Sequence, residues 1–169
     1  CALNILWTFA WLYVFYFLSL VFMVGILLTM IGIYVRGGIG KPATSWGERL
    51  WVHLPFSLYL SWIAVATIAN AASLLAYYGW SAFGVSDSLW SAIMILIAAL
   101  VGAAVLWRRA NAAYAAVYVW AVLAVAARYA NEPPITFAAY AGIVIVVAAA
   151  VIGWVRFVKD GGNRRLDPA

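Results

Sequence analysis

The sequence predicts an all-α integral membrane protein, a single bundle of about five to six transmembrane helices. Of its 169 residues, 69% are hydrophobic and 9% are charged, and the mean hydropathy is +1.04. Soluble domains carry roughly 25% charged residues, so this chain has more apolar surface than a water-soluble fold can bury. The apolar segments are long and do not alternate with polar residues, which indicates helices rather than the strands of a membrane barrel.

The first apolar run, residues 3–35, is too long for one span of about 20 residues. Aromatic side chains crowd its middle, and Trp and Tyr prefer the membrane–water interface. We therefore expect two helices, over about residues 2–13 and 19–36, with Ser19 as the N-cap of the second. One long tilted helix is the alternative.

Cys1 is the single cysteine, which excludes an internal disulfide and a cysteine metal cluster. The chain enters its apolar run without a Met, a basic leader or a cleavage-site pattern. We expect that the true N-terminus lies upstream. The alternative is that Cys1 is the lipidated first residue of a mature bacterial lipoprotein.

The central helix is expected over about residues 46–78, after a glycine-rich break. Ser45 is a suitable N-cap, and Glu48 lies at the spacing of a capping-box partner. The first turns are amphipathic, so we expect them to lie along the interface and Pro55 to kink the helix where it enters the membrane. Gly79 provides the end signal.

Three further helices are expected, over about residues 88–107, 111–129 and 135–158, and residues 159–169 are expected to form a cytoplasmic tail. Each boundary carries a cap or turn signal. In chain order these are Ser86 with Asp87, residues 108–111, residues 131–134, and Gly161 with Gly162.

The basic residues divide unevenly between the two ends of the expected bundle. If the helices alternate, Arg128 alone lies on one side and the other nine of the ten Lys and Arg lie opposite. Since Lys and Arg mark the cytoplasmic rim, we expect a cytoplasmic C-terminus in a bacterial inner or intracytoplasmic membrane, and no nucleic-acid binding. The nine are Arg36, Lys41, Arg49, Arg108, Arg109, Arg156, Lys159, Arg164 and Arg165.

The sequence offers little for catalysis or ion transport. All five acidic residues lie in expected loops or helix ends, and no expected span holds an ionisable residue at mid-depth, as proton relays need. There is no phosphate-binding loop, Ser/His/Asp set or HExxH motif, so we expect neither an enzyme nor a metal site. His53 is either an axial ligand of a tetrapyrrole or, more simply, an interfacial side chain that extends to water.

One stripe of the central helix differs from a lipid-facing surface. Tyr59, Trp62, Ala66 and Asn70 follow one another at steps of three or four residues. Lipid-facing stripes carry Leu, Ile and Val, so this one is expected to face protein or ligand. From periodicity alone, a helix–helix interface and a ligand wall remain equally open. Asn4 and Asn70 are expected to hydrogen-bond to neighbouring helices.

Two motifs carry more specific information. Residues 3–7 read Leu-Asn-Ile-Leu-Trp, and residues 55–67 read Pro-Phe-Ser-Leu-Tyr-Leu-Ser-Trp-Ile-Ala-Val-Ala-Thr, with Asn70 after them. They resemble the signatures of the third and fifth helices of the translocator protein, or tryptophan-rich sensory protein (TspO), family. The resemblance covers about residues 1–78. Because three further helices follow, the chain is similar to an extended branch of that family, although the family's first two helices and first loop are absent from the sequence.

The resemblance implies a binding function with a sensory or regulatory role. Family members bind porphyrins, haem and hydrophobic drugs, often bind sterols, and often form dimers. The expected ligand here is a porphyrin, haem or (bacterio)chlorophyll-type tetrapyrrole, whereas Ala71 departs from the cholesterol-recognition pattern. By position, the resemblance implies pocket roles for Trp7, Trp62, Ala66 and Thr67, and the stripe adds two more residues. The expected ligand-binding residues are thus Trp7, Tyr59, Trp62, Ala66, Thr67 and Asn70.

A second function class remains open. The chain is Ala-rich and lacks ionisable residues inside its spans, which suits a small structural or accessory subunit of a larger membrane complex. Its aromatic faces would then contact lipids, pigments or partner helices. A cavity lined by Trp7, Trp62 and Ala66 favours ligand binding, and partner helices packed on that face favour the subunit.

Overall fold

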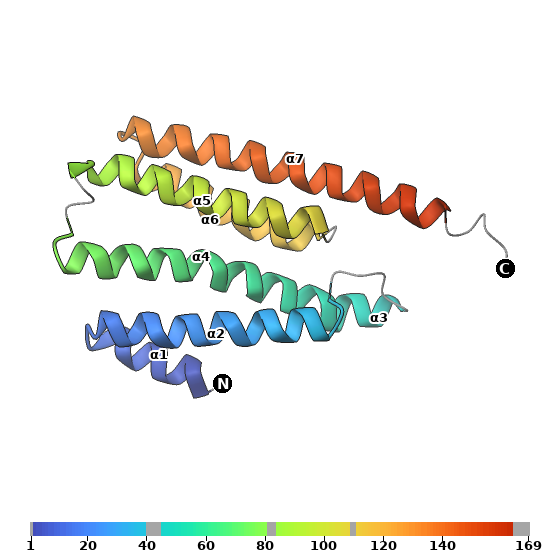
Figure 1. The fold of residues 1–169 in the computed structure, drawn as a ribbon, viewed down its shortest axis with the longest axis horizontal. Helices are drawn as coiled ribbons and strands as arrows, with labels where there is room; N and C mark the ends of the chain where they lie inside the picture. The colour runs from blue at the N-terminus through green and yellow to red at the C-terminus, as the bar shows by residue number, and fades with distance from the viewer. Residues whose placement is uncertain (1, 40–44, 81–83, 109–110, 164–169) are drawn as a thin grey trace.

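The computed structural model describes residues 2–39, 45–80, 84–108 and 111–163, and in these ranges the chain is helical without strands. Four helical segments are long and apolar enough to cross a membrane. The chain is therefore an all-α integral membrane protein, as its composition predicts. In chain order (Figure 1), the elements are α1 (Ala2–Leu12), α2 (Tyr16–Arg36), α3 (Trp46–Glu48), the π-helical segment η1 (Arg49–His53), α4 (Leu54–Tyr77), α5 (Asp87–Arg108), α6 (Ala112–Arg128) and α7 (Pro133–Asn163).

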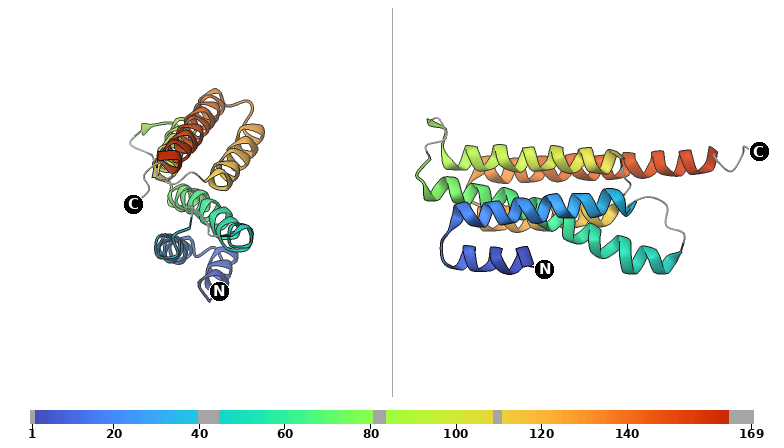
Figure 2. Two further views of the ribbon diagram at one scale, coloured as in Figure 1. Left: turned by 90° about the vertical axis from the view of Figure 1, so that its right-hand side faces the viewer. Right: turned by 60° about the horizontal axis from the view of Figure 1, so that its bottom comes forward.

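The helices form two groups that pack side by side. In one, α2 lies between α1 and α4; in the other, α7 packs along both α5 and α6 (Figure 2). The groups meet chiefly where α4 contacts α6. At that contact, Ser61 donates a hydrogen bond of 2.9 Å to the carbonyl oxygen of Tyr114, and the Asn111 amide donates one of 2.5 Å to Ser57 Oγ.

The first apolar run is broken, so the alternative of one long tilted helix is not adopted. The chain turns at Val14, which has a φ of 64°, and α2 begins at Tyr16. The expectation that Ser19 caps this helix is wrong. Ser19 lies inside α2 and is fully buried. Its hydroxyl accepts a hydrogen bond of 2.8 Å from the Asn70 amide of α4.

The start of the central helix follows the expected cap. Ser45 Oγ accepts a hydrogen bond of 3.1 Å from the backbone N–H of Glu48. The helix then widens into η1 directly before Pro55. Proline lacks an N–H, and its ring clashes with the carbonyl four residues earlier in a regular α-helix, so a wider turn at this point relieves the conflict.

The last helix is longer than expected. Gly161 and Gly162 do not end it, since α7 continues to Asn163. Glycine costs about 1 kcal/mol relative to alanine in a helix. Extending a long existing helix requires no new nucleation, so two glycines near its end are tolerated. Of the expected tail, residues 164–169 lie outside the described residues.

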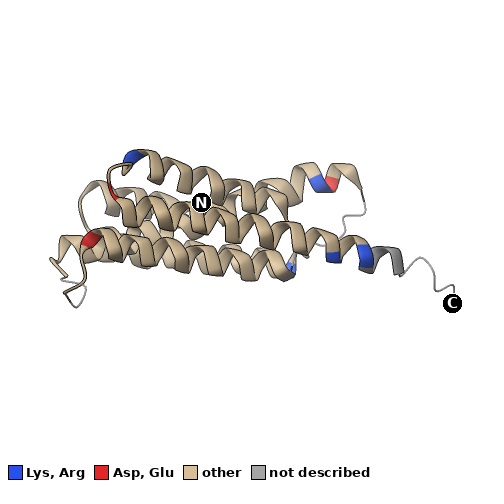
Figure 3. Ribbon diagram, turned by 90° about the horizontal axis from the view of Figure 1, so that it is seen from above, with Lys and Arg blue, Asp and Glu red and all other residues tan. Residues whose placement is uncertain are grey.

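The two ends of the bundle differ in charge (Figure 3). Arg36, Arg49, Arg156 and Lys159 lie where α2, η1 and α7 reach the same end of the molecule. Among the described residues, Arg128 is the one basic residue at the opposite end, where α6 finishes. This arrangement brings together at one end the residues that the sequence predicts for the cytoplasmic rim.

Candidate ligand pocket

An apolar pocket of about 540 Å³ lies between α1, α4 and α6. Its walls are aromatic and small side chains, and none of its described lining residues is charged. Because alanines occupy much of two walls, space remains there for a ligand body. The described lining residues are Asn4, Trp7, Trp11, Met23, Tyr59, Trp62, Ile63, Val65, Ala66, Ala69, Asn70, Trp120, Ala121, Ala124 and Val125.

Five of the six residues expected to bind ligand line this pocket, and Thr67 does not. Thr67 lines a separate gap of about 290 Å³, between α4 and its neighbours α2, α5 and α6. Its hydroxyl donates to the Ile63 carbonyl oxygen at 2.7 Å within α4. The arc of α4 that lines the pocket includes the neighbouring pairs Trp62–Ile63, Val65–Ala66 and Ala69–Asn70, and Thr67 lies beyond the edge of this arc.

Two hydrogen bonds link α4 to the helices beside it. Tyr59 on α4 donates to Asn4 Oδ1 on α1 at 2.8 Å, and Asn70 on α4 donates to Ser19 on α2 at 2.8 Å. The expectation that both asparagines bond across helices is confirmed. Such bonds contribute about 0.6–2 kcal/mol each in lipid.

Two polar atoms in the pocket-lining residues have no hydrogen-bond partner. They are Trp7 Nε1, a donor, and Asn70 Oδ1, an acceptor, and both atoms are buried. Buried polar groups are normally hydrogen-bonded, since an unsatisfied one costs about 1–3 kcal/mol. A ligand carrying a complementary group would remove this cost.

Trp120 completes the aromatic wall from α6, and the sequence analysis missed it. Its ring centroid lies 5.6 Å from that of Trp62, and the two side chains are 62% and 45% exposed. Trp120 sits in the middle of its helix rather than at an interface. In the sequence, Trp62 is singled out because it lies in the middle of its helix, away from the interfaces. The same criterion would have identified Trp120.

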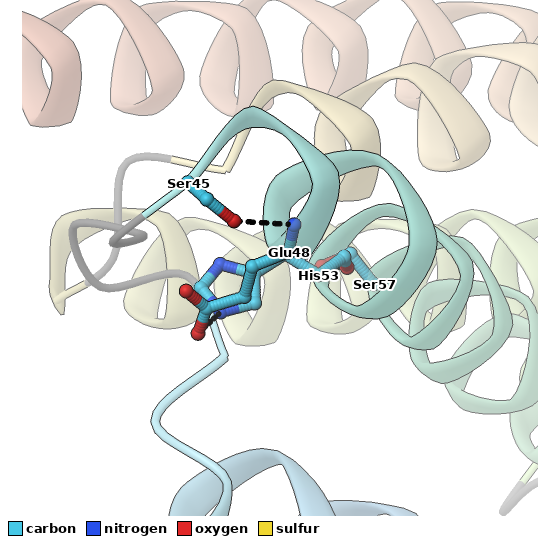
Figure 4. Close-up of polar contacts among 4 residues, drawn as sticks. All are labelled: Ser45, Glu48, His53 and Ser57. Carbon is cyan, nitrogen blue, oxygen red and sulfur yellow. Dashed lines mark hydrogen bonds and ion pairs between the residues drawn. The ribbon is translucent and has the colours of Figure 1, made fainter.

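His53 lies away from the pocket, toward the end of the bundle that carries most basic residues. Its Nε2 is 3.5 Å from Glu48 Oε1, and its carbonyl oxygen accepts a hydrogen bond of 2.6 Å from Ser57 (Figure 4). The side chain is buried, so the expectation that it extends to water is wrong. The contact with Glu48 thus engages Nε2, one of the two ring nitrogens that could ligate the metal of a tetrapyrrole.

The segments that line the pocket lie within a region that matches a known sequence family. The chain matches the sequence profile of the TSPO-like protein family over residues 1–152. The match includes the pocket-lining segments of α1, α4 and α6 and most of α7. No curated protein and no solved structure matches the chain significantly.

Proposed function

The chain belongs to the TSPO-like protein family, and on this premise we propose that it binds porphyrins or other apolar ligands within the membrane, in a sensory or regulatory role. The observation that carries the proposal is the uncharged aromatic pocket between α1, α4 and α6. Its volume of about 540 Å³ falls in the range of roughly 300–1,000 Å³ typical of small-molecule sites.

The pocket suits a flat tetrapyrrole better than a compact polar molecule. Trp7, Trp62 and Trp120 offer ring faces on which a macrocycle can stack without needing charge. Among the described lining residues there is no histidine, so stacking rather than axial ligation to a metal would hold the ligand. The described lining also lacks a carboxyl or imidazole group for general acid–base work, which supports binding rather than catalysis.

Porphyrin titration of the protein in lipid nanodiscs, followed by the Soret absorbance, tests the proposal. Ala66→Phe fills the pocket and is expected to weaken binding at least about tenfold, because the added ring takes the space of the ligand. The matched control is Ala104→Phe, which places the same ring at an exposed position of α5. Equal binding by both variants and the wild type would show that this pocket is not the site.

A second pair of variants tests the aromatic wall. Trp62→Leu is expected to weaken porphyrin binding about three- to tenfold through loss of stacking. Trp51→Leu removes a tryptophan that is 77% exposed and lies outside the pocket, so it should bind like the wild type. Absorbance is preferable to fluorescence here, because each variant removes one of ten tryptophans.

A second candidate function is that of an accessory subunit of a larger membrane complex. The observation that favours it is the exposure of Trp62 and Trp120 at the side of the pocket, where a helix of a partner or of a second copy could cover them. If the wild-type protein binds no porphyrin, photocrosslinking from position 120 in membranes would test this function. Capture of one defined partner helix would support it.

A further inference from the structure

Arg128 is the residue whose position the proposed function leaves unexplained. Among the described residues, it is the one basic side chain at its end of the bundle (Figure 3). Basic residues concentrate at the cytoplasmic side of membrane proteins, so a single arginine at the other end departs from the pattern that orients this chain.

The helical position of Arg128 aligns it with the pocket. It follows Ala121, Ala124 and Val125 of the pocket wall by seven, four and three residues, the spacings that share one face of a helix. At a rise of about 1.5 Å per residue, its Cα lies about 4.5 Å beyond that of Val125 along α6. Arg128 therefore stands at the outer end of the face that lines the pocket.

The guanidinium has no carboxylate partner in the part of the chain that the structure describes. Its carbon lies 5.7 Å from the centre of the Tyr129 ring. Glu132 is four residues further along, but its carboxylate accepts a hydrogen bond of 2.5 Å from Ser88 on α5. The charge of Arg128 is thus available to a ligand.

The pocket itself excludes charge. A carboxylate buried among the uncharged lining residues would lose its hydration without a partner, which costs several kcal/mol. An acidic group on a ligand must therefore emerge at an end of the pocket. At the opposite end, Arg49 precedes Tyr59 by ten residues, or about 15 Å along the helix, whereas Arg128 is less than one turn from Val125.

We propose that Arg128 binds the anionic group of an amphipathic ligand whose apolar body occupies the pocket. The inference rests on the proposed function and narrows its ligand class to apolar molecules with an acidic substituent at one edge. A guanidinium pairs with a carboxylate or phosphate through two parallel hydrogen bonds, so it would fix the orientation of the ligand as well as its affinity. The anionic group can be the carboxylate of a tetrapyrrole or the phosphate of a lipid.

A matched pair of ligands tests the charge contact. Protoporphyrin IX carries two carboxylates, and its dimethyl ester has the same macrocycle without them. In nanodiscs of zwitterionic phosphatidylcholine, which has no net charge, with empty nanodiscs subtracted, we expect the wild type to bind the acid about tenfold more tightly than the ester. Arg128→Gln should lower the affinity for the acid about tenfold and leave the affinity for the ester within twofold.

The control variant is Arg156→Gln. It removes one positive charge at the other end of the bundle, where the guanidinium carbon of Arg156 lies 4.3 Å from the Trp107 ring centre, and it should retain the preference for the acid. An equal loss of both ligands in Arg128→Gln, or no loss of either, would overturn the inference while the proposed function stands. If the wild type binds neither porphyrin, the proposed function fails and the inference with it.

Repeating the acid titration in phosphatidylglycerol nanodiscs separates the two sources of the anionic group. If the wild type binds the acid more weakly in phosphatidylglycerol than in phosphatidylcholine, and Arg128→Gln abolishes this difference while Arg156→Gln does not, a lipid phosphate occupies the same guanidinium. If the affinity for the acid is the same in both lipids and Arg128→Gln still lowers it, the contact is assigned to the carboxylate of the ligand.

Discussion

The two halves of the bundle hold their helices together in different ways. In the α1–α2–α4 half, side chains form the links, from Tyr59 to Asn4 and from Asn70 to Ser19. In the α5–α6–α7 half, α5 and α7 approach so closely that a Cβ on Gly153 would meet the backbone carbonyl oxygen of Leu106. Small residues allow this contact, which is a common basis of helix association in lipid.

The difference explains where the pocket lies. Close backbone contact fills the space between two helices, whereas the hydrogen bond from the long Tyr59 side chain to Asn4 joins α4 to α1 without such contact. Asn4 and Tyr59 form this bond and also line the pocket. The half that is held by side chains is therefore the half that contributes most of the ligand wall.

The largest expected effect concerns the orientation of the bundle in the membrane, which is common to both halves. The basic residues predict that the end of α7 lies in the cytoplasm and the α4–α5 connection lies outside. In a Cys1→Ser background, a cysteine at Ser86 should react with an impermeant thiol reagent from the outside, and a cysteine at Asn163 only after the membrane is permeabilised. Labelling of both from one side would contradict the predicted topology.

Gly153→Ala should break the glycine-packed half. Its new Cβ would meet the backbone carbonyl group of Leu106, which cannot move aside as a side chain can. We expect a loss of about 3 kcal/mol in the free energy of unfolding, measured by SDS titration followed by circular dichroism. Gly32→Ala is the control, because nothing lies within 4 Å of a Cβ there, and it should stabilise α2 by about 0.5–1 kcal/mol. Similar results for both would show that close packing at Gly153 is unimportant.

Gly142→Ala should destabilise the same half by less, about 2 kcal/mol. The Cβ would lie 2.6 Å from the hydroxyl of Tyr118, which donates a hydrogen bond of 3.1 Å to the Ile95 carbonyl oxygen and so resists displacement. In a Tyr118→Phe background the obstructing oxygen is gone, and Gly142→Ala should then cost less than half as much. A cost that does not change in this double-mutant cycle would place the conflict elsewhere.

Asn70→Leu tests the half that is held by side chains and should have the smallest effect, about 1 kcal/mol. The change removes the hydrogen bond of 2.8 Å to Ser19. In a Ser19→Ala background that bond is already lost, so the second substitution should cost little more. If Asn70→Leu leaves the unfolding midpoint of the wild type unchanged, its amide does not stabilise the fold, and a role in ligand contact is favoured.

Much of the fold was predictable from local properties of the chain. Hydropathy and length indicate the spans, and the Ser45 cap follows from its spacing to Glu48. Gly161 and Gly162 predict an earlier end than α7 has, because two glycines at the end of a long helix that has already formed do not stop its extension. The sequence could not distinguish the two roles of Ser19, because a hydroxyl at a plausible cap position is equally suited to a cross-helix hydrogen bond.

The sequence by itself determined which residues share a face of α4, because a face depends only on the helical repeat. Tyr59, Trp62, Ala66 and Asn70 could be grouped in this way before any neighbour was known. Only the tertiary structure decided that α6 supplies the remaining wall with Trp120. Helices in lipid select their neighbours by the fit of small and large side chains rather than by hydrophobicity, and that fit depends on two surfaces at once.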